Sequence, residues 1–149
     1  MDLLKALATQ RHTLAGEMNV ILEEAQDTPV RELLRRTAEG WLRLMRQEDH
    51  LVSMLLAESL THPELQQAFN EITEMQIGKF AAYLQTRVEA GELREDLPVR
   101  ASAMMLTSPL LTFFITNRQL SNEDWEQRAR PYIEGILDHW LRGAFRNRE

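Results

Sequence analysis

The sequence predicts an all-α fold: a single bundle of five or six helices. Apolar residues recur at spacings of three and four almost throughout the chain, and no stretch shows the sustained alternation of a half-buried strand. The breaks between these periodic segments carry residues that typically begin or end helices. A length of 149 residues suits one domain with one core, so we expect residues 1–149 to form a single unit.

A proline turn separates the first two predicted helices. We expect the first helix over residues 3–24 and the second from Pro29 to Gln47. Thr28 is suited to cap the second helix. Pro29 is suited to its first position, where a backbone amide has no partner within the helix.

The middle of the chain predicts a short helix followed by a long one. Asp49 could cap the short helix, which ends near Leu60. The long helix begins at Pro63 and runs to about Ala90. Gly91 then occupies the position of a left-handed C-cap.

Two helices are predicted in the last third of the chain, and the first of them is the most apolar helix of the sequence. The first of them runs from Pro98 to about Asn117 and contains Pro109, which removes one backbone hydrogen bond and predicts a kink near residues 105–109. Ser121 or Asn122 caps the final helix, whose first turn is acidic, as the positive end of a helix favours.

These two helices predict a homodimer. A helix that is apolar on more than one face must be covered on more than one side, and a single small bundle rarely provides that. Pairing with the same helices of a two-fold partner would form a four-helix interface. The alternative is that the same side chains fill the core of one chain. The predicted interface residues are Leu110, Phe113, Phe114, Trp125, Tyr132, Ile133, Ile136, Leu137 and Trp140.

The interior predicts a pocket for a small hydrophobic or amphipathic molecule. The chain has 7 methionines, most of them on core-facing stripes, and methionine adapts its shape to what it contacts. Aromatic and a few polar residues on the same stripes would complete such a pocket. Ordinary core packing is the alternative interpretation. The candidate residues are Trp41, Met45, Met54, Glu58, Phe80, Tyr83, Met104, Met105, Ser108 and Thr112.

Composition narrows the classes of function. The sequence has no cysteine, which excludes disulfides and thiolate chemistry and fits the cytoplasm. Its formal net charge of -6 makes direct DNA binding by this chain unfavourable. The N-terminus lacks the basic-then-apolar pattern of a signal peptide, and no apolar run is long enough to span a membrane, so we expect no membrane association.

Catalytic and metal-binding patterns are weak. None of the four histidines has a glutamate three residues before it, as di-iron bundles require. Glu58 and His62 are four residues apart, but His62 falls in a predicted turn, and His12 resembles a solvated surface residue. We therefore expect no catalytic residues, metal or cofactor. A small helical-bundle enzyme remains an alternative of a different class, although no acid–base pair or nucleophile stands out.

Four short segments, in order, resemble the C-terminal domain of TetR-family transcriptional regulators. They are Leu55-Leu56-Ala57-Glu58, His62-Pro63-Glu64-Leu65, Gly91-Glu92-Leu93-Arg94-Glu95-Asp96 and Pro98-Val99-Arg100-Ala101. The resemblance covers essentially the whole chain and implies a ligand pocket among the first five helices and a dimer built from the last two.

The resemblance also implies a function that depends on a DNA-binding headpiece. TetR-family regulators begin with a three-helix headpiece, whereas here Met1 stands where the first sensor helix is expected. Ligand binding would control DNA binding by that headpiece, which we expect to be absent from this chain. The chain is then either a fragment of a longer regulator or a natural headless partner that forms dimers with full-length regulators and titrates them.

Overall fold

The computed structural model describes residues 6, 9, 16, 22–23 and 27–145. Residues 30–145 form five helices: α2 (Val30–Gln47), α3 (Asp49–Ser59), α4 (Pro63–Glu89), α5 (Val99–Asn117) and α6 (Asn122–Ala144). The predicted all-α fold is confirmed. Most of the helix predicted over residues 3–24 lies outside the described residues.

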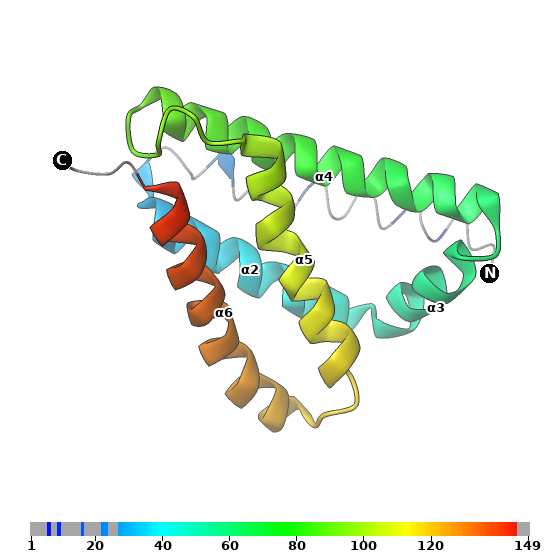
Figure 1. The fold of residues 1–149 in the computed structure, drawn as a ribbon. Helices are drawn as coiled ribbons and strands as arrows, with labels where there is room; N and C mark the ends of the chain where they lie inside the picture. The colour runs from blue at the N-terminus through cyan, green and yellow to red at the C-terminus, as the bar shows by residue number, and fades with distance from the viewer. Residues whose placement is uncertain (1–5, 7–8, 10–15, 17–21, 24–26, 146–149) are drawn as a thin grey trace.

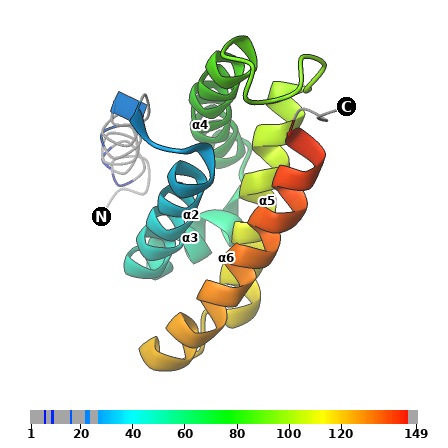
Figure 2. The same cartoon turned by 90° about the vertical axis from the view of Figure 1, so that its left-hand side faces the viewer.

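α5 is the central helix of the bundle. It contacts α2, α4 and α6, while α3 packs mainly on α4 and α2 packs on α6. In Figure 1, α4 runs the full width of the molecule and α5 crosses in front of α2. Figure 2 shows α5 and α6 running antiparallel side by side, joined by the short 118–121 turn. The expectation that no apolar run is long enough to span a membrane is wrong by length and composition, because α5 has 19 residues and a mean hydropathy of 1.3. Here, however, α5 packs on three helices.

The core consists of a large apolar cluster and a smaller one. The large cluster joins α2, the second half of α4, α5 and α6, and its fully buried side chains include Leu34, Phe80 and Phe114. The small cluster joins α3 to the first half of α4 through Leu55 and Leu65. The bundle is therefore less densely joined at its α3 end than around α5.

The helix boundaries agree with the sequence prediction to within about one residue, but two predicted caps are wrong. Pro29, not Thr28, occupies the N-cap position of α2, and no side chain caps that end. Asp49 is already the first residue of α3, and its carboxylate binds Arg118 instead. A proline before α2 and an ion pair at α3 therefore replace the expected caps.

Two other predicted helix ends are confirmed. The Ser121 side chain caps α6 by accepting a hydrogen bond from the backbone N–H of Asp124 at 3.2 Å. Gly91, just beyond α4, has φ of 79°, the left-handed conformation that glycine adopts readily. The loop after it is tied to the end of α6 by a hydrogen bond of 2.9 Å from the N–H of Arg94 to the carbonyl of Ala144.

Candidate ligand pocket and dimer surface

A cavity of about 230 Å³ lies between α2, α3, α4 and α5. It occupies the boundary between the two apolar clusters: Leu55, Phe69 and Ile72 belong to the small cluster, and Met45 and Ile77 to the large one. The described residues lining it are Trp41, Leu44, Met45, Val52, Leu55, Leu56, Phe69, Ile72, Thr73, Gln76, Ile77, Met104, Thr107, Ser108 and Leu111.

Helical spacing explains why these residues converge. On α4, Phe69, Ile72 and Gln76 are three and four residues apart, so their side chains share one face of the helix. On α5, Met104, Ser108 and Leu111 have the same spacing, and their side chains lie across the cavity from the α4 residues. The cavity is therefore walled by one stripe from each of these two helices and closed by α2 and α3.

Four of the ten predicted pocket residues line this cavity: Trp41, Met45, Met104 and Ser108. Phe80 and Tyr83 are instead buried in the large cluster, where their rings lie 6.1 Å apart between centroids. The other four are not part of the lining, and Met105, for example, is 69% exposed on α5. The predicted residues outside the lining are Met54, Glu58, Met105 and Thr112.

Three polar lining residues escaped the sequence prediction: Thr73, Gln76 and Thr107. Gln76 is the most informative, because it is only 7% exposed. The signal was present in the sequence, where Gln76 interrupts a run of core-facing positions between Ile72 and Phe80. A polar residue at a core position is a stronger indication of a site than another apolar residue there.

The cavity wall is uncharged. None of the described residues that line it has an ionisable side chain, and its polar groups come from α4 and α5 apart from the indole N–H of Trp41. The hydroxyl of Thr107 donates its hydrogen to the backbone carbonyls of Ala103 or Met104, each at 3.2 Å. The wall therefore suits apolar atoms accompanied by a few hydrogen-bonding groups.

A larger hollow of about 660 Å³ lies between α3 and the end of α5, lined by Ser53, Leu56, Ala57 and residues 114–120. An ion pair of 3.0 Å between Asp49 and Arg118 joins the same two helices. The guanidinium lowers the pKa of the Asp49 carboxyl below its usual value, chiefly by hydrogen bonding. Only one turn of α3 and the end of α5 wall this hollow, so the four-helix cavity is the better candidate for a ligand site.

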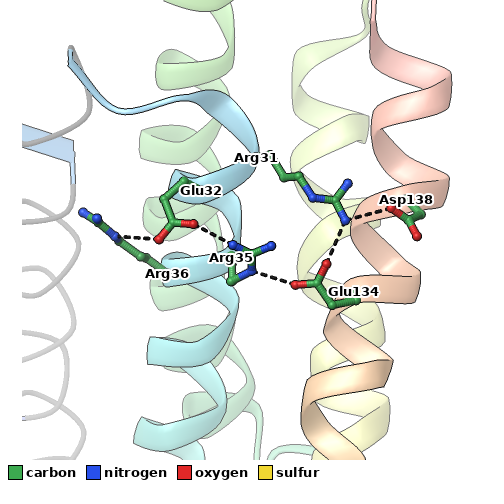
Figure 3. Close-up of polar contacts among 6 residues, drawn as sticks. All are labelled: Arg31, Glu32, Arg35, Arg36, Glu134 and Asp138. Atoms are coloured by element: carbon green, nitrogen blue, oxygen red, sulfur yellow. Dashed lines mark hydrogen bonds and ion pairs between the residues drawn. The ribbon is translucent and has the colours of Figure 1, made fainter.

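A network of ion pairs fastens the start of α2 to the middle of α6 (Figure 3). The carboxylate of Glu134 accepts hydrogen bonds of 2.6 Å from Arg35 and 2.7 Å from Arg31. Arg31 also binds Asp138 at 2.8 Å, and Arg35 also binds Glu32 at 2.6 Å. The hydrogen bond from Arg35, followed by that from Arg31, lowers the pKa of Glu134 to about 2.

The Glu58–His62 pair belongs to the turn between α3 and α4. The Nδ1 of His62 lies 3.0 Å from the Oε2 of Glu58 and 3.0 Å from the Oγ1 of Thr61, and all three side chains have substantial exposure. Within the part of the chain that the structure describes, no three His, Cys, Asp or Glu residues are grouped so that they could hold a metal ion. His12 lies outside the described residues.

Seven of the nine predicted dimer residues are buried within a single chain. Trp125 and Ile133 are each 4% exposed, and the Nε1 of Trp140 donates a hydrogen bond of 2.9 Å to the backbone carbonyl of Ser102. Because α2 and α4 cover α5 and α6 from one side, these side chains fill the intrachain core, as the alternative interpretation stated. The seven are Leu110, Phe113, Phe114, Trp125, Ile133, Leu137 and Trp140.

The outward face of α5 and α6 carries a different set of residues. Tyr132 and Ile136 are half-buried, and the hydroxyl of Tyr132 donates a hydrogen bond of 2.8 Å to the carbonyl of Pro109. Met105 on α5 is 69% exposed. Gly135, also exposed, lies between Tyr132 and Ile136 in sequence. This face, which we call the α5/α6 face, consists of Met105, Thr112, Tyr132, Gly135, Ile136 and His139.

Comparison with known proteins identifies a family and a structural neighbour. Residues 25–130 match the tetracyclin repressor-like, C-terminal domain. The fold is similar to the crystal structure of a transcriptional regulator FadR from Bacillus subtilis in complex with stearoyl-CoA, with a TM-score of 0.67 and 17% sequence identity over 92% of this chain and 73% of that chain. Comparison with curated proteins gave no match. At 17% identity, the likeness to FadR concerns the fold.

Proposed function

Because the chain belongs to the tetracyclin repressor-like C-terminal domain family, we propose that it is the ligand-binding and dimerisation core of a cytoplasmic transcriptional regulator. Occupancy of the cavity between α2, α3, α4 and α5 would control DNA binding by the regulator's helix-turn-helix headpiece. The net charge of -6 supports a sensor role for this chain and leaves contact with DNA to the headpiece.

The observation that carries the proposal is the four-helix cavity itself. Its wall of Trp, Met, Leu, Ile, Val and Phe side chains with a few hydroxyl and amide groups has the composition of a small-molecule site. Its volume of about 230 Å³ exceeds the roughly 150 Å³ of an engineered apolar cavity that binds benzene. A hydrophobic or amphipathic molecule is the class of ligand that this wall favours.

The neighbour with the same fold supports a ligand of this kind. The FadR structure is a complex with stearoyl-CoA, which combines a long acyl chain with a polar carrier. We propose by analogy that an acyl or similarly apolar group enters the cavity of this chain.

One helix, α5, would connect the cavity to the proposed dimer. α5 contributes Met104 and Ser108 to the cavity and Met105 and Thr112 to the α5/α6 face. A ligand that favours one position of α5 would thereby favour one arrangement of the two protomers. Such coupling is a shift between pre-existing states, and its size equals the difference in ligand affinity between them.

A neutral fluorescent probe tests the cavity directly. N-phenyl-1-naphthylamine should bind the purified wild-type chain with an increase in fluorescence, and Thr73→Trp, which fills the cavity from α4, should abolish that increase. Gln66→Trp adds the same side chain to an exposed position of the same helix and should leave binding intact. Equal probe binding by wild type and Thr73→Trp would contradict the assignment of this cavity.

A further inference from the structure

Gln76 places an unpartnered amide against the cavity. Its side chain is 7% exposed, and no hydrogen bond joins it to any residue that the structure describes. Its amide atoms are not among the enclosed polar atoms that lack a partner, so in the absence of a ligand they remain accessible to water in the cavity. Leucine or methionine at this position would pack on the same face of α4 but would offer the cavity no hydrogen-bonding group. The amide is therefore poised to bond with something that enters the cavity.

The other residues of the cavity wall limit the chemical class of the ligand. A carboxylate, phosphate or ammonium group in the cavity would lose its hydration and meet no charge of the opposite sign, since none of the described lining residues is ionisable. The sides formed by α2 and α3 present Leu44, Met45, Val52, Leu55 and Leu56. A charged group is thus excluded from the cavity, and apolar atoms are favoured on the α2 and α3 sides.

The polar side of the cavity has a definite hydrogen-bonding capacity. An amide offers two N–H donors and one carbonyl acceptor, so Gln76 can bond equally well to a carbonyl or to a hydroxyl oxygen. Thr73 lies one turn before Gln76 on α4, and Thr107 and Ser108 face the cavity from α5. Since Thr107 donates its own hydrogen to the backbone, its oxygen can only accept a further bond.

We propose that the cavity takes an uncharged, mostly apolar molecule with one hydroxyl or carbonyl oxygen, which the amide of Gln76 recognises. The inference rests on the proposed function, because it assumes that this cavity is the ligand site. It adds the charge class of the buried part of the ligand and the residue that orients it.

Three probes with the same ring system separate these contributions: naphthalene, 2-naphthol and 2-naphthoate. Binding to the wild-type chain, Gln76→Leu and the matched control Gln66→Leu is measured by probe fluorescence at pH 7. We expect Gln76→Leu to weaken 2-naphthol by about two- to tenfold, as the loss of one hydrogen bond implies. The affinity for naphthalene should be unchanged or higher. 2-Naphthoate should bind the wild type at least about tenfold more weakly than 2-naphthol.

The outcomes distinguish this inference from the proposed function. If naphthalene binds but 2-naphthol has the same affinity for wild type and Gln76→Leu, or 2-naphthoate binds as tightly as 2-naphthol, the cavity is a ligand site and the role of Gln76 is wrong. If none of the three probes binds the wild type, both proposals fail. The melting temperature of the unliganded protein is an independent check: Gln76→Leu should leave it unchanged or raise it relative to Gln66→Leu, and a decrease would show that the amide has a partner within the chain.

Discussion

At Glu134, two arginines from α2 converge on one carboxylate of α6, and the arrangement makes stability depend on pH. The pKa of Glu134 falls from 4.5 to about 2 because both guanidiniums favour the ionised form. A carboxyl group with a lowered pKa stabilises the folded state above its unfolded pKa, and this contribution is lost as the pH falls from about 4.5 through about 2. Its side chain is 34% exposed, so solvent and salt reduce the effect.

We predict that Glu134→Gln removes this part of the pH dependence. At neutral pH the variant should melt at a lower temperature than the wild type, and the difference should shrink between pH 4.5 and pH 2. Thermal unfolding followed by circular dichroism across this range measures it. Glu126→Gln, at an exposed position of the same helix, is the control. A constant difference between Glu134→Gln and wild type at every pH would show that the carboxylate is not held in its ionised form.

Trp140 illustrates how a single buried donor joins two helices. Its indole N–H bonds to the carbonyl of Ser102 on α5, 38 residues away in sequence. Trp140→Phe keeps an aromatic ring but removes the donor and some volume, so we predict a loss of about 1–3 kcal/mol in the free energy of unfolding. Equilibrium urea denaturation provides the measurement. Phe145→Leu, at a 46% exposed position, should cost much less, and equal losses would contradict the role assigned to Trp140.

For individual residues, the sequence was a good guide to burial and a poor guide to the site. Trp41, Met45, Met104 and Ser108 were expected at the pocket and line the cavity, whereas Phe80 is buried in the core. All five lie on apolar stripes in the sequence. Whether such a side chain contacts another helix or empty space depends on where four helices leave a gap, which periodicity does not report.

Among the helices in the described part of the chain, only α6 has an N-terminus that is capped by a side-chain hydrogen bond. Ser121→Ala removes the side-chain oxygen that accepts from the N–H of Asp124. We predict a loss of about 0.5–2 kcal/mol in the free energy of unfolding, measured by urea denaturation. Ser121→Asp retains an acceptor at the same position and should recover most of the stability. Failure of Ser121→Asp to do so would show that the loss arises elsewhere than at the cap.

Pro109 interrupts the backbone hydrogen bonding of α5. Pro109 has no N–H, so the carbonyl four residues earlier lacks its helical partner, while its own carbonyl accepts from Tyr132. We predict that Pro109→Ala slows amide hydrogen exchange around residues 105–109 and changes the affinity for N-phenyl-1-naphthylamine, because α5 forms one wall of the cavity.

Pro131 provides a matched control for this prediction. It also lies inside a helix, α6, which contributes no described residue to the cavity wall. Pro131→Ala should slow exchange locally in α6 without altering probe affinity. If Pro109→Ala leaves both exchange and affinity unchanged, the proline does not loosen α5.

The sequence predicted helix ends correctly where the backbone properties of glycine or proline favour an end. Gly91 and Pro63 mark ends that the structure confirms, because φ in glycine and the missing amide of proline are local properties. Thr28 and Asp49 were predicted as caps but are not, and the carboxylate of Asp49 binds Arg118, 69 residues away. Side-chain caps can be replaced by such long-range partners, which local sequence does not reveal.

For the whole molecule, the described residues show a bundle whose largest aromatic side chains are already covered within one chain. The sequence indicated that α5 is apolar on more sides than a small bundle covers and that α6 adds large aromatic residues, but Phe113, Phe114, Trp125 and Trp140 are buried within one chain. What remains for a second copy is the α5/α6 face. It combines the exposed Met105 with Gly135, which has no side chain and so lets two helices approach closely.

A two-fold dimer through this face is the last prediction. Native mass spectrometry of the wild-type chain should show a dimer, and Gly135→Arg should convert it to a monomer with unchanged helical circular dichroism, since two-fold symmetry brings the same residue to the interface twice. Leu60→Arg, at an 86% exposed position at the end of α3, should remain dimeric. A folded Gly135→Arg dimer would place the interface elsewhere, and a monomeric wild type would remove the link between cavity and dimer on which the sensor mechanism depends.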